Sequence, residues 1–360
     1  MNDENRPRTH RWYKNQRPGG RREPEPERLR VRVPQGKVED PARVAEATRE
    51  ALKGWPVVVL KLVGTPDESF RIGRHPGRWL RKYIGHCIDS ELCSCQGPRC
   101  ILPECKAHRL IGRHAVSTKP DGEAWAPWVI RAAGTATGSI KKGQPIRCEL
   151  VFAGAESVAV LPDFLRMLRG QPQAPPREPN VDWGTIQNLV LDADGEGRWR
   201  KSEPESIASA LLPLERLTEP ALRPRRLVVT FLSTTPLGRR EETGIPSGNL
   251  PLFIDRVGRS MGAWMGRTSH RGPRLPIDDL LRCASEATLV ADNTNLVRVT
   301  SALLGAAGSQ TADGPIDVPA LLGSMTFKGD LSGLAPLLRA ASYLGLGPGR
   351  QHGLGQIALR

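Results

Sequence analysis

The sequence predicts an α+β protein, and two observations lead to that fold class. The first is the order of the elements predicted between residues 55 and 191, which is strand, helix, strand, strand, helix, strand. That order is typical of a ferredoxin-like unit. The second is a similar series that begins after a proline-containing break at 218–224 and closes with a helix, a glycine-rich loop and a short strand.

Hydrophobic periodicity defines the elements of the first half. The apolar run at 55–64 predicts a buried strand, which ends at Gly64-Thr65-Pro66 because glycine and proline interrupt strands. The spacing of apolar residues predicts a helix at 77–86 with Trp79, Leu80, Tyr83 and Ile84 facing inward. The other predicted elements are strands at 128–131, 147–152 and 181–191 and a helix at 161–168.

The second half repeats this pattern. An apolar run predicts a strand at 226–232, and apolar side chains at helical spacing predict a helix at 250–265. The acid pair Asp278-Asp279 fits the start of a helix. The remaining predicted elements are strands at 287–291, 296–303, 323–331 and 356–359 and a helix that begins near Leu334.

The composition shifts along the chain predict three regions. Residues 1–35 mix arginine, proline and acidic residues without apolar periodicity, so we expect a mobile tail that is either solvated or in contact with a nucleic acid. We expect an N-terminal domain at 36–222 and a C-terminal domain at 223–360.

The net charge indicates a polyanionic partner. The chain carries a formal charge of +14, its isoelectric point is about 9.9, and arginines outnumber lysines. Arginine matches phosphate geometry, but charge alone does not distinguish RNA from DNA or from an anionic membrane. No apolar run reaches the length of a membrane span and the start has no signal-peptide core, so we expect a cytoplasmic protein without a membrane partner.

A glycine-rich loop near the C-terminus is the most specific motif. Five glycines lie within 345–355, after a helical apolar stripe and before a short strand. Glycines allow positive φ and close approach, so their amides can bind an anion such as phosphate, and Arg350 adds a charge. Dinucleotide and Walker loops run from strand to glycines to helix, which excludes both. The alternative is a glycine helix cap followed by a turn.

This loop resembles the signature of the CRISPR-associated RAMP proteins, in which two Gly-x-Gly pairs flank five residues that include a basic one. Gly345 and Gly347 form the first pair here, Gly353 and Gly355 the second, and Arg350 is the basic residue. Within that superfamily the chain is most similar to the endoribonuclease that cuts precursor CRISPR RNA. The segment 325–330 and the leucine-rich helix after it also resemble the C-terminal region of that family.

The resemblance implies a fold, an activity and partners. It implies two tandem ferredoxin-like (RAMP) units, binding of CRISPR repeat or guide RNA, and cleavage that leaves a 2′,3′-cyclic phosphate without a metal cofactor. Other CRISPR effector subunits are implied as further partners. Close relatives often place a histidine and a lysine around the first glycine pair, where this chain has Leu344 and Pro348. The alternatives are a non-catalytic RAMP subunit that holds guide RNA and an unrelated basic zinc protein.

A cysteine-rich insert is predicted at 87–108. In a cytosolic protein such a cluster indicates metal rather than disulfides, and four thiolates can enclose a tetrahedral zinc. Members of the resembling family often carry such an insert. Free thiols and a redox role are the alternatives, and an all-cysteine site leaves no position for catalytic water. The predicted structural-zinc ligands are Cys93, Cys95, Cys100 and Cys105.

Two histidines are candidates for the proton transfers of RNA cleavage. A base must deprotonate the 2′-hydroxyl and an acid must protonate the leaving 5′ oxygen. The resemblance implies one such histidine near the first helix. His86 is predicted at the end of that helix, where the helix C-terminus favours imidazolium, and His75 lies just before its start. Their alternative roles are metal binding for His86 and shaping of the helix start for His75.

Basic residues around the first helix are candidates for phosphate contacts, and a solvated face is the alternative. Inside the loop, His352 is a candidate for an RNA contact or an acid. The predicted RNA-binding residues are Arg74, Arg78, Arg81, Lys82, Gly345, Gly347, Arg350, His352, Gly353 and Gly355.

Overall fold

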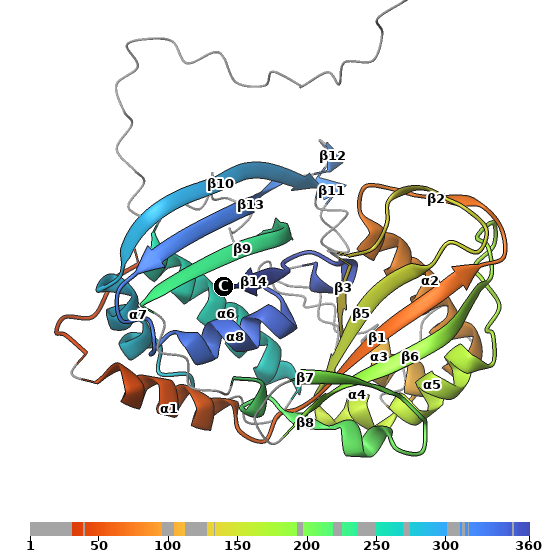
Figure 1. Cartoon of the computed structure of the whole chain (residues 1–360), viewed down its shortest axis with the longest axis horizontal. Helices are drawn as coiled ribbons and strands as arrows, with labels where there is room; N and C mark the ends of the chain where they lie inside the picture. The colour runs from red at the N-terminus through yellow and green to blue at the C-terminus, as the bar shows by residue number, and fades with distance from the viewer. Residues whose placement is uncertain are drawn as a thin grey trace, which may run out of the picture. The chain divides into compact units, whose positions relative to one another are not determined.

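The computed structural model describes most of the chain after residue 30 (Figure 1). The described residues are 31–38, 40–95, 104–111, 128–132, 134–192, 197–218, 225–236, 249–268, 274–300, 310–311, 314–315, 317–347 and 349–360. Residues 1–30 of the predicted tail and 219–224 of the predicted boundary lie outside them. The described residues belong to one compact unit, Val31–Arg360.

The first half forms an antiparallel sheet built on β1 (Pro56–Pro66). Its strand order is β3-β5-β1-β6-β7, and the short β8 also pairs with β1. The predicted strands at 128–131 and 181–191 are confirmed at the same bounds. The other strands of this sheet are β3 (Trp128–Arg131), β5 (Ile146–Ala153), β6 (Val181–Leu191), β7 (Gly197–Lys201) and β8 (Leu212–Pro213).

The continuous apolar run of β1 follows from burial on both of its faces. Val58, Leu60 and Leu62 share a core with helices of the first half, while Val57 and Val59 belong to a core shared with the second half. The helices of the first half are α2 (Pro76–Leu92), α3 (Lys106–Ile111), α4 (Ala155–Ala159) and α5 (Leu161–Arg169).

The second sheet is also antiparallel, with the order β10-β13-β9-β14. Figure 1 shows α6 and α8 on the same face of this sheet. Phe231 of the sheet meets Phe253 of α6 edge to face, with ring centroids 5.9 Å apart. The elements are β9 (Arg226–Thr235), α6 (Leu250–Thr268), α7 (Ile277–Ser285), β10 (Thr288–Thr300), β13 (Asp317–Lys328), α8 (Ala335–Leu344) and β14 (Ile357–Leu359).

The two strands predicted at 287–291 and 296–303 are wrong as separate elements. The polar residues 292–295 predict a break, but β10 runs through them and pairs with β13 from Ala291 to Thr300 without interruption. Thr294 also donates its backbone amide to Asp292 Oδ1 at 3.0 Å. Pairing with β13 supplies backbone hydrogen bonds that local sequence does not reveal, so the strand continues.

Further elements were not predicted. The helix α1 (Pro41–Leu52) begins after Asp40, whose carboxylate accepts from the Ala42 amide at 2.9 Å and caps it. The short elements are β2 (Phe70–Ile72), β4 (Gly138–Ile140), β11 (Gln310–Thr311), β12 (Gly314–Pro315), η2 (Ile207–Ala210), η3 (Arg216–Thr218) and η5 (Arg350–His352). Among the helices in the described part of the chain, none combines the length and apolarity that a membrane span requires.

Candidate functional site

The glycine-rich loop has the backbone that its composition predicts. Gly345, Gly347, Gly349, Gly353 and Gly355 all have φ between 67° and 85°. At Gly355 a Cβ atom would lie 1.8 Å from the Leu346 carbonyl oxygen, so any other residue would collide with the backbone. The loop is therefore folded tightly on itself between α8 and β14.

The amides of the signature glycines donate within the protein. Gly345 donates to Ala341 O at 2.8 Å, Gly347 to Ser260 Oγ at 3.1 Å, Gly353 to Arg350 O at 3.1 Å and Gly355 to Thr234 O at 3.0 Å. Arg350 is only 8% exposed. The RNA contacts predicted for these five residues stay a prediction, because the loop uses these donors to hold its own shape.

The loop packs directly on the start of α2. A Cβ atom at Gly77 would lie 2.3 Å from the His352 carbonyl oxygen, and one at Gly353 would lie 3.0 Å from Gly77 Cα. Glycine at both positions therefore lets the two backbones touch. This role of Gly77 was not predicted from the sequence, although a glycine in the first turn of a helix permits a close approach of another backbone.

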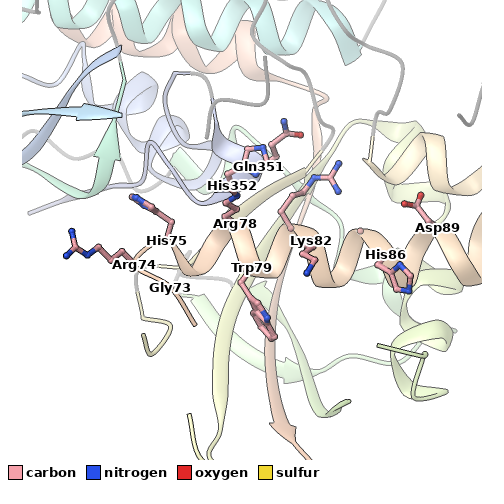
Figure 2. A pocket seen from close by; sticks show the side chains of 12 residues that line it. Gly73, Arg74, His75, Arg78, Trp79, Lys82, His86, Asp89, Gln351 and His352 are labelled. Carbon is pink, nitrogen blue, oxygen red and sulfur yellow. The ribbon is translucent and has the colours of Figure 1, made fainter. Parts of the chain in front are cut away.

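This contact closes one side of a pocket of about 930 Å³, shown in Figure 2. Seven of the residues predicted from sequence line it, including both candidate histidines and His352, whereas the signature glycines and Arg350 do not. The lining residues are Gly73, Arg74, His75, Arg78, Trp79, Arg81, Lys82, Gly85, His86, Asp89, Gln351 and His352.

One face of α2 supplies most of this lining. His75, Arg78, Lys82, His86 and Asp89 are spaced by three or four residues, which places them on one side of a helix. His75 precedes the helix as its N-cap residue. His86 lies eleven positions after His75, or about 16 Å along the axis at about 1.5 Å per residue.

The prediction that His86 ends the first helix is wrong. The helix continues to Leu92, so His86 lies in its interior. The argument that the helix C-terminus favours imidazolium therefore does not apply, because the helix dipole acts within the last turn. The predicted helix is too short because the apolar periodicity continues through Cys87 and Ile88, which are buried.

Two histidines of the pocket are shifted toward the neutral form. Burial, then Arg81 and Arg78, lowers the pKa of His352 to about 4. Partial desolvation, then Arg78 and Arg74, lowers the pKa of His75. The Nδ1 atom of His352 is buried and has no hydrogen-bond partner among the described residues. Arg78 thus acts on both rings.

Two cationic side chains of the pocket, Lys82 and Arg81, contact different kinds of partner. Lys82 Nζ lies 2.8 Å from Glu178 Oε1, and the other oxygen of Glu178 accepts from Trp79 Nε1 at 2.9 Å. The Arg81 guanidinium lies 5.4 Å from the ring centre of Trp128. A Cβ atom at Gly85 would lie 2.3 Å from Arg81 Nη1, so glycine there makes room for this arginine. Glu178 was not predicted as part of the site because it lies in a proline-rich loop about a hundred residues further along the chain.

Three of the four predicted zinc ligands come together at the end of α2. The sulfur atoms of Cys93, Cys95 and Cys105 lie within 4.8 Å of one another, with 3.8 Å between Cys93 and Cys105. In a tetrahedral site with Zn–S bonds of about 2.3 Å, sulfurs lie about 3.8 Å apart, so these thiols fit zinc. Cys100 lies outside the described residues. Burial raises the pKa of Cys87 to about 12, which keeps it a thiol.

Comparisons with known proteins find a family match in the C-terminal part of the chain. Residues 229–357 match the family model of the CRISPR-associated endoribonuclease Cas6. No curated protein matches the chain. This matched segment holds β10, β13, most of β9 and the glycine-rich loop, while α2 lies outside it.

The similarity of this chain to solved structures is low, both in sequence identity and in TM-score. A Cas6 product complex is 18% identical at a TM-score of 0.48 and covers 85% of this chain and 100% of its own. Thermus thermophilus Cas6 is 15% identical at a TM-score of 0.46, and the match covers 85% of this chain and 99% of that one. A RAMP protein described as binding different RNA substrates is 12% identical at a TM-score of 0.42, and the match covers 84% of this chain and 99% of that one. The family match confirms the resemblance to the CRISPR-associated RAMP endoribonucleases for residues 229–357 of this chain.

Proposed function

We propose that the protein binds CRISPR repeat RNA in the pocket between α2 and the glycine-rich loop and cleaves precursor CRISPR RNA there. The observation that carries this proposal is the pocket itself, which gathers three histidines with four cationic side chains. The family match of residues 229–357 supports RNA cleavage as the activity.

The reaction we propose needs no metal. The 2′-hydroxyl attacks the neighbouring phosphate, the bond to the 5′ oxygen breaks, and a 2′,3′-cyclic phosphate remains. A histidine transfers protons near neutral pH, and arginines stabilise the charge that develops on the phosphate oxygens. His75 and His86 are the catalytic candidates, and a separation of about 16 Å along α2 means that only one of them serves a given linkage.

The exposed cations of the pocket are the proposed phosphate contacts. Arg74, Arg78 and Lys82 are exposed, and Arg81 is half-buried beside them. In this proposal His352 contacts the RNA directly. Gly345, Gly347, Arg350, Gly353 and Gly355 belong to the same proposed RNA-binding loop and give it the shape that presents Gln351 and His352.

We propose two ferredoxin-like units, at 36–222 and 223–360, as the architecture. In each unit four strands follow one another along the chain in the order strand, helix, strand, strand, helix, strand. Across each sheet these four strands lie in the order second, third, first, fourth. This order is β3-β5-β1-β6 in the first sheet and β10-β13-β9-β14 in the second. That is the arrangement expected of a ferredoxin-like unit. The cysteine-rich insert at 87–108 lies within the first unit.

We also propose a structural zinc in that insert, bound by Cys93, Cys95, Cys105 and, as predicted from sequence, Cys100. Zinc would fix the end of α2 relative to α3, which carries no catalytic candidate. Catalysis in this proposal does not depend on the ion.

Cleavage of repeat RNA in EDTA tests the function. The substrate is the labelled repeat RNA encoded beside the gene, and a matched RNA with a 2′-deoxy residue at the cut site is the control. We expect cleavage of the first and not the second, with a product that resists phosphatase until acid opens its cyclic phosphate. Tight binding of both without cleavage would instead support the non-catalytic RAMP subunit, which Leu344 and Pro348 in place of the usual histidine and lysine favour.

Salt dependence tests the site of binding. Each phosphate contact contributes about 0.7 to 0.9 to the slope of log affinity against log salt. We expect Arg78→Ala to flatten that slope by about one charge, whereas Lys53→Ala, at the end of α1 and paired with Glu50, leaves it unchanged. An unchanged slope in Arg78→Ala would place the RNA elsewhere.

A further inference from the structure

His75 and His352 lie at the same end of the pocket (Figure 2). The backbone of His352 touches Gly77, two residues after His75, and both imidazoles line the pocket beside Arg78. His86 lies about 16 Å further along α2, too far to act on the same linkage. The loop end therefore holds two imidazoles with Arg74, Arg78 and Arg81 around them, whereas the other end holds His86 next to Asp89.

We propose that His75 and His352 form the acid–base pair of the reaction, with His352 as the proton acceptor, His75 as the proton donor and Arg78 between them on the scissile phosphate. This inference rests on the proposed function and selects the catalytic end of its pocket. It assigns the role of proton acceptor to a loop histidine for which the sequence predicted an RNA contact or an acid.

The environment of each ring decides which role it takes. His352 is half-buried and faces Arg81 and Arg78 of α2, so burial and these positive charges keep it neutral and able to accept a proton. Arg131 of β3, the other element packed on the loop, is neutralised by Glu149 at 2.9 Å. His75 is exposed, so it can take up a proton from solvent, and the partial desolvation and the charges of Arg78 and Arg74 that lower its pKa in the free protein are opposed by the bound phosphate.

The RNA itself completes the pair. A phosphodiester placed against Arg78 brings negative charge to both rings, which favours their protonated forms and raises both pKa values toward the working pH. The 2′-hydroxyl proton then passes to His352 as the 2′ oxygen bonds to phosphorus. The bond from phosphorus to the 5′ oxygen breaks, and that oxygen takes the proton of the His75 imidazolium. Exchange with water restores both histidines.

A substrate with sulfur in place of the bridging 5′ oxygen separates the two roles, because a thiolate leaves without protonation. Rates are measured with protein in excess, in EDTA, for His75→Ala, His352→Ala, His86→Ala and the wild type. On ordinary repeat RNA we expect His75→Ala and His352→Ala each to cleave about a hundredfold more slowly, or worse. On the sulfur-bridged RNA we expect His75→Ala to come within about threefold of the wild type, while His352→Ala stays about a hundredfold slower.

Binding to the uncleavable 2′-deoxy RNA checks that the variants fold, and His352→Asn replaces His352→Ala if the latter does not. The assignment is overturned if sulfur rescues both variants alike, if it rescues neither, or if His352→Ala keeps a third or more (roughly) of the wild-type rate on ordinary RNA. It is also overturned if the large loss occurs in His86→Ala and not in His352→Ala. A wild-type protein that cleaves neither RNA would refute the proposed function itself, which distinguishes the two failures.

Discussion

At the scale of single residues, the pocket depends on side chains whose charge is set by their neighbours. His352 is kept neutral by burial and by two arginines, and Lys82 is held by Glu178. Neither property follows from residue type, since an exposed histidine titrates near 6.5 and an exposed lysine has no fixed partner. The positive charge of the site therefore comes mainly from its arginines, while the half-buried loop histidine is unprotonated.

The lowered pKa of His352 predicts a dependence of stability on pH. Between pH 6.5 and about 4 the unfolded chain holds a proton on this imidazole that the folded protein lacks, so unfolding takes up a proton and acid favours it. Stability should therefore fall as pH drops through this window, and His75 contributes with the same sign.

When the pH falls from about 7 to about 5, we expect the urea concentration at the midpoint of unfolding to decrease less for His352→Gln than for the wild type. Lys53→Gln, an exposed surface change, serves as the control and should follow the wild type. Equal losses in His352→Gln and the wild type would show that His352 is not shifted in this way.

At the scale of elements, the start of α2 and the glycine-rich loop form one unit through the contact of Gly77 with Gly353. Alanine in place of glycine inside a helix normally stabilises by up to about 1 kcal/mol. At Gly77 the added methyl would lie 2.3 Å from a backbone oxygen of the loop, which has no side chain that could move aside.

We expect Gly77→Ala to destabilise the protein by about 1–3 kcal/mol and to weaken RNA binding, because the loop must move away from α2. Gly262→Ala in α6 is the matched control, since nothing lies within 4 Å of its added methyl and the usual stabilisation should appear. Urea unfolding of both variants measures the difference. A stabilised Gly77→Ala variant would mean that the loop and helix do not touch.

The end of α2 and α3 form a second unit if zinc joins them. We expect about one zinc per chain in the purified protein, and its loss in Cys105→Ser, whose sulfur lies 3.8 Å from that of Cys93. Cys283→Ser, a buried cysteine of α7 outside the cluster, should retain the metal. Zinc content well below one per chain in the wild type would leave these cysteines as free thiols.

At the scale of the whole molecule, the two sheets share a core and a buried polar contact. Val57, Val59 and Val129 of the first sheet pack in the same core as Phe231 and Phe327 of the second. The terminal loop adds Gln356, which is 2% exposed and donates Nε2 to Ile130 O at 3.1 Å and to Gly353 O at 2.8 Å. A single side chain thus joins edge strand β3 of one sheet to the loop of the other.

Gln356→Leu should destabilise the protein by about 1–3 kcal/mol, because two buried carbonyl groups lose a donor and stay out of water. Gln35→Leu, at an exposed position, should change the free energy of unfolding by less than about 0.5 kcal/mol. Denaturant titration gives both values, and equal effects would show that the contact contributes nothing to stability.

The sequence by itself determined the α+β class, the principal strands and helices, the tightly turning glycine loop and most residues of the pocket. These features follow from local periodicity and from residues that permit positive φ, and both are visible in short windows of sequence. Sequence could not determine that β10 is continuous or that α2 extends past His86, because pairing and burial override local signals.

Only the tertiary structure decided which of the candidates meet. The contact of Gly77 with the loop brings His352 beside His75 and Arg78, while the helical rise carries His86 to the other end of the pocket. The tertiary structure also buries Arg350, and the amides of the loop glycines donate hydrogen bonds to acceptors within the protein. Residues 75 and 352 come together because two sheets bury a common apolar core, and such packing between distant segments leaves no periodic trace in the sequence.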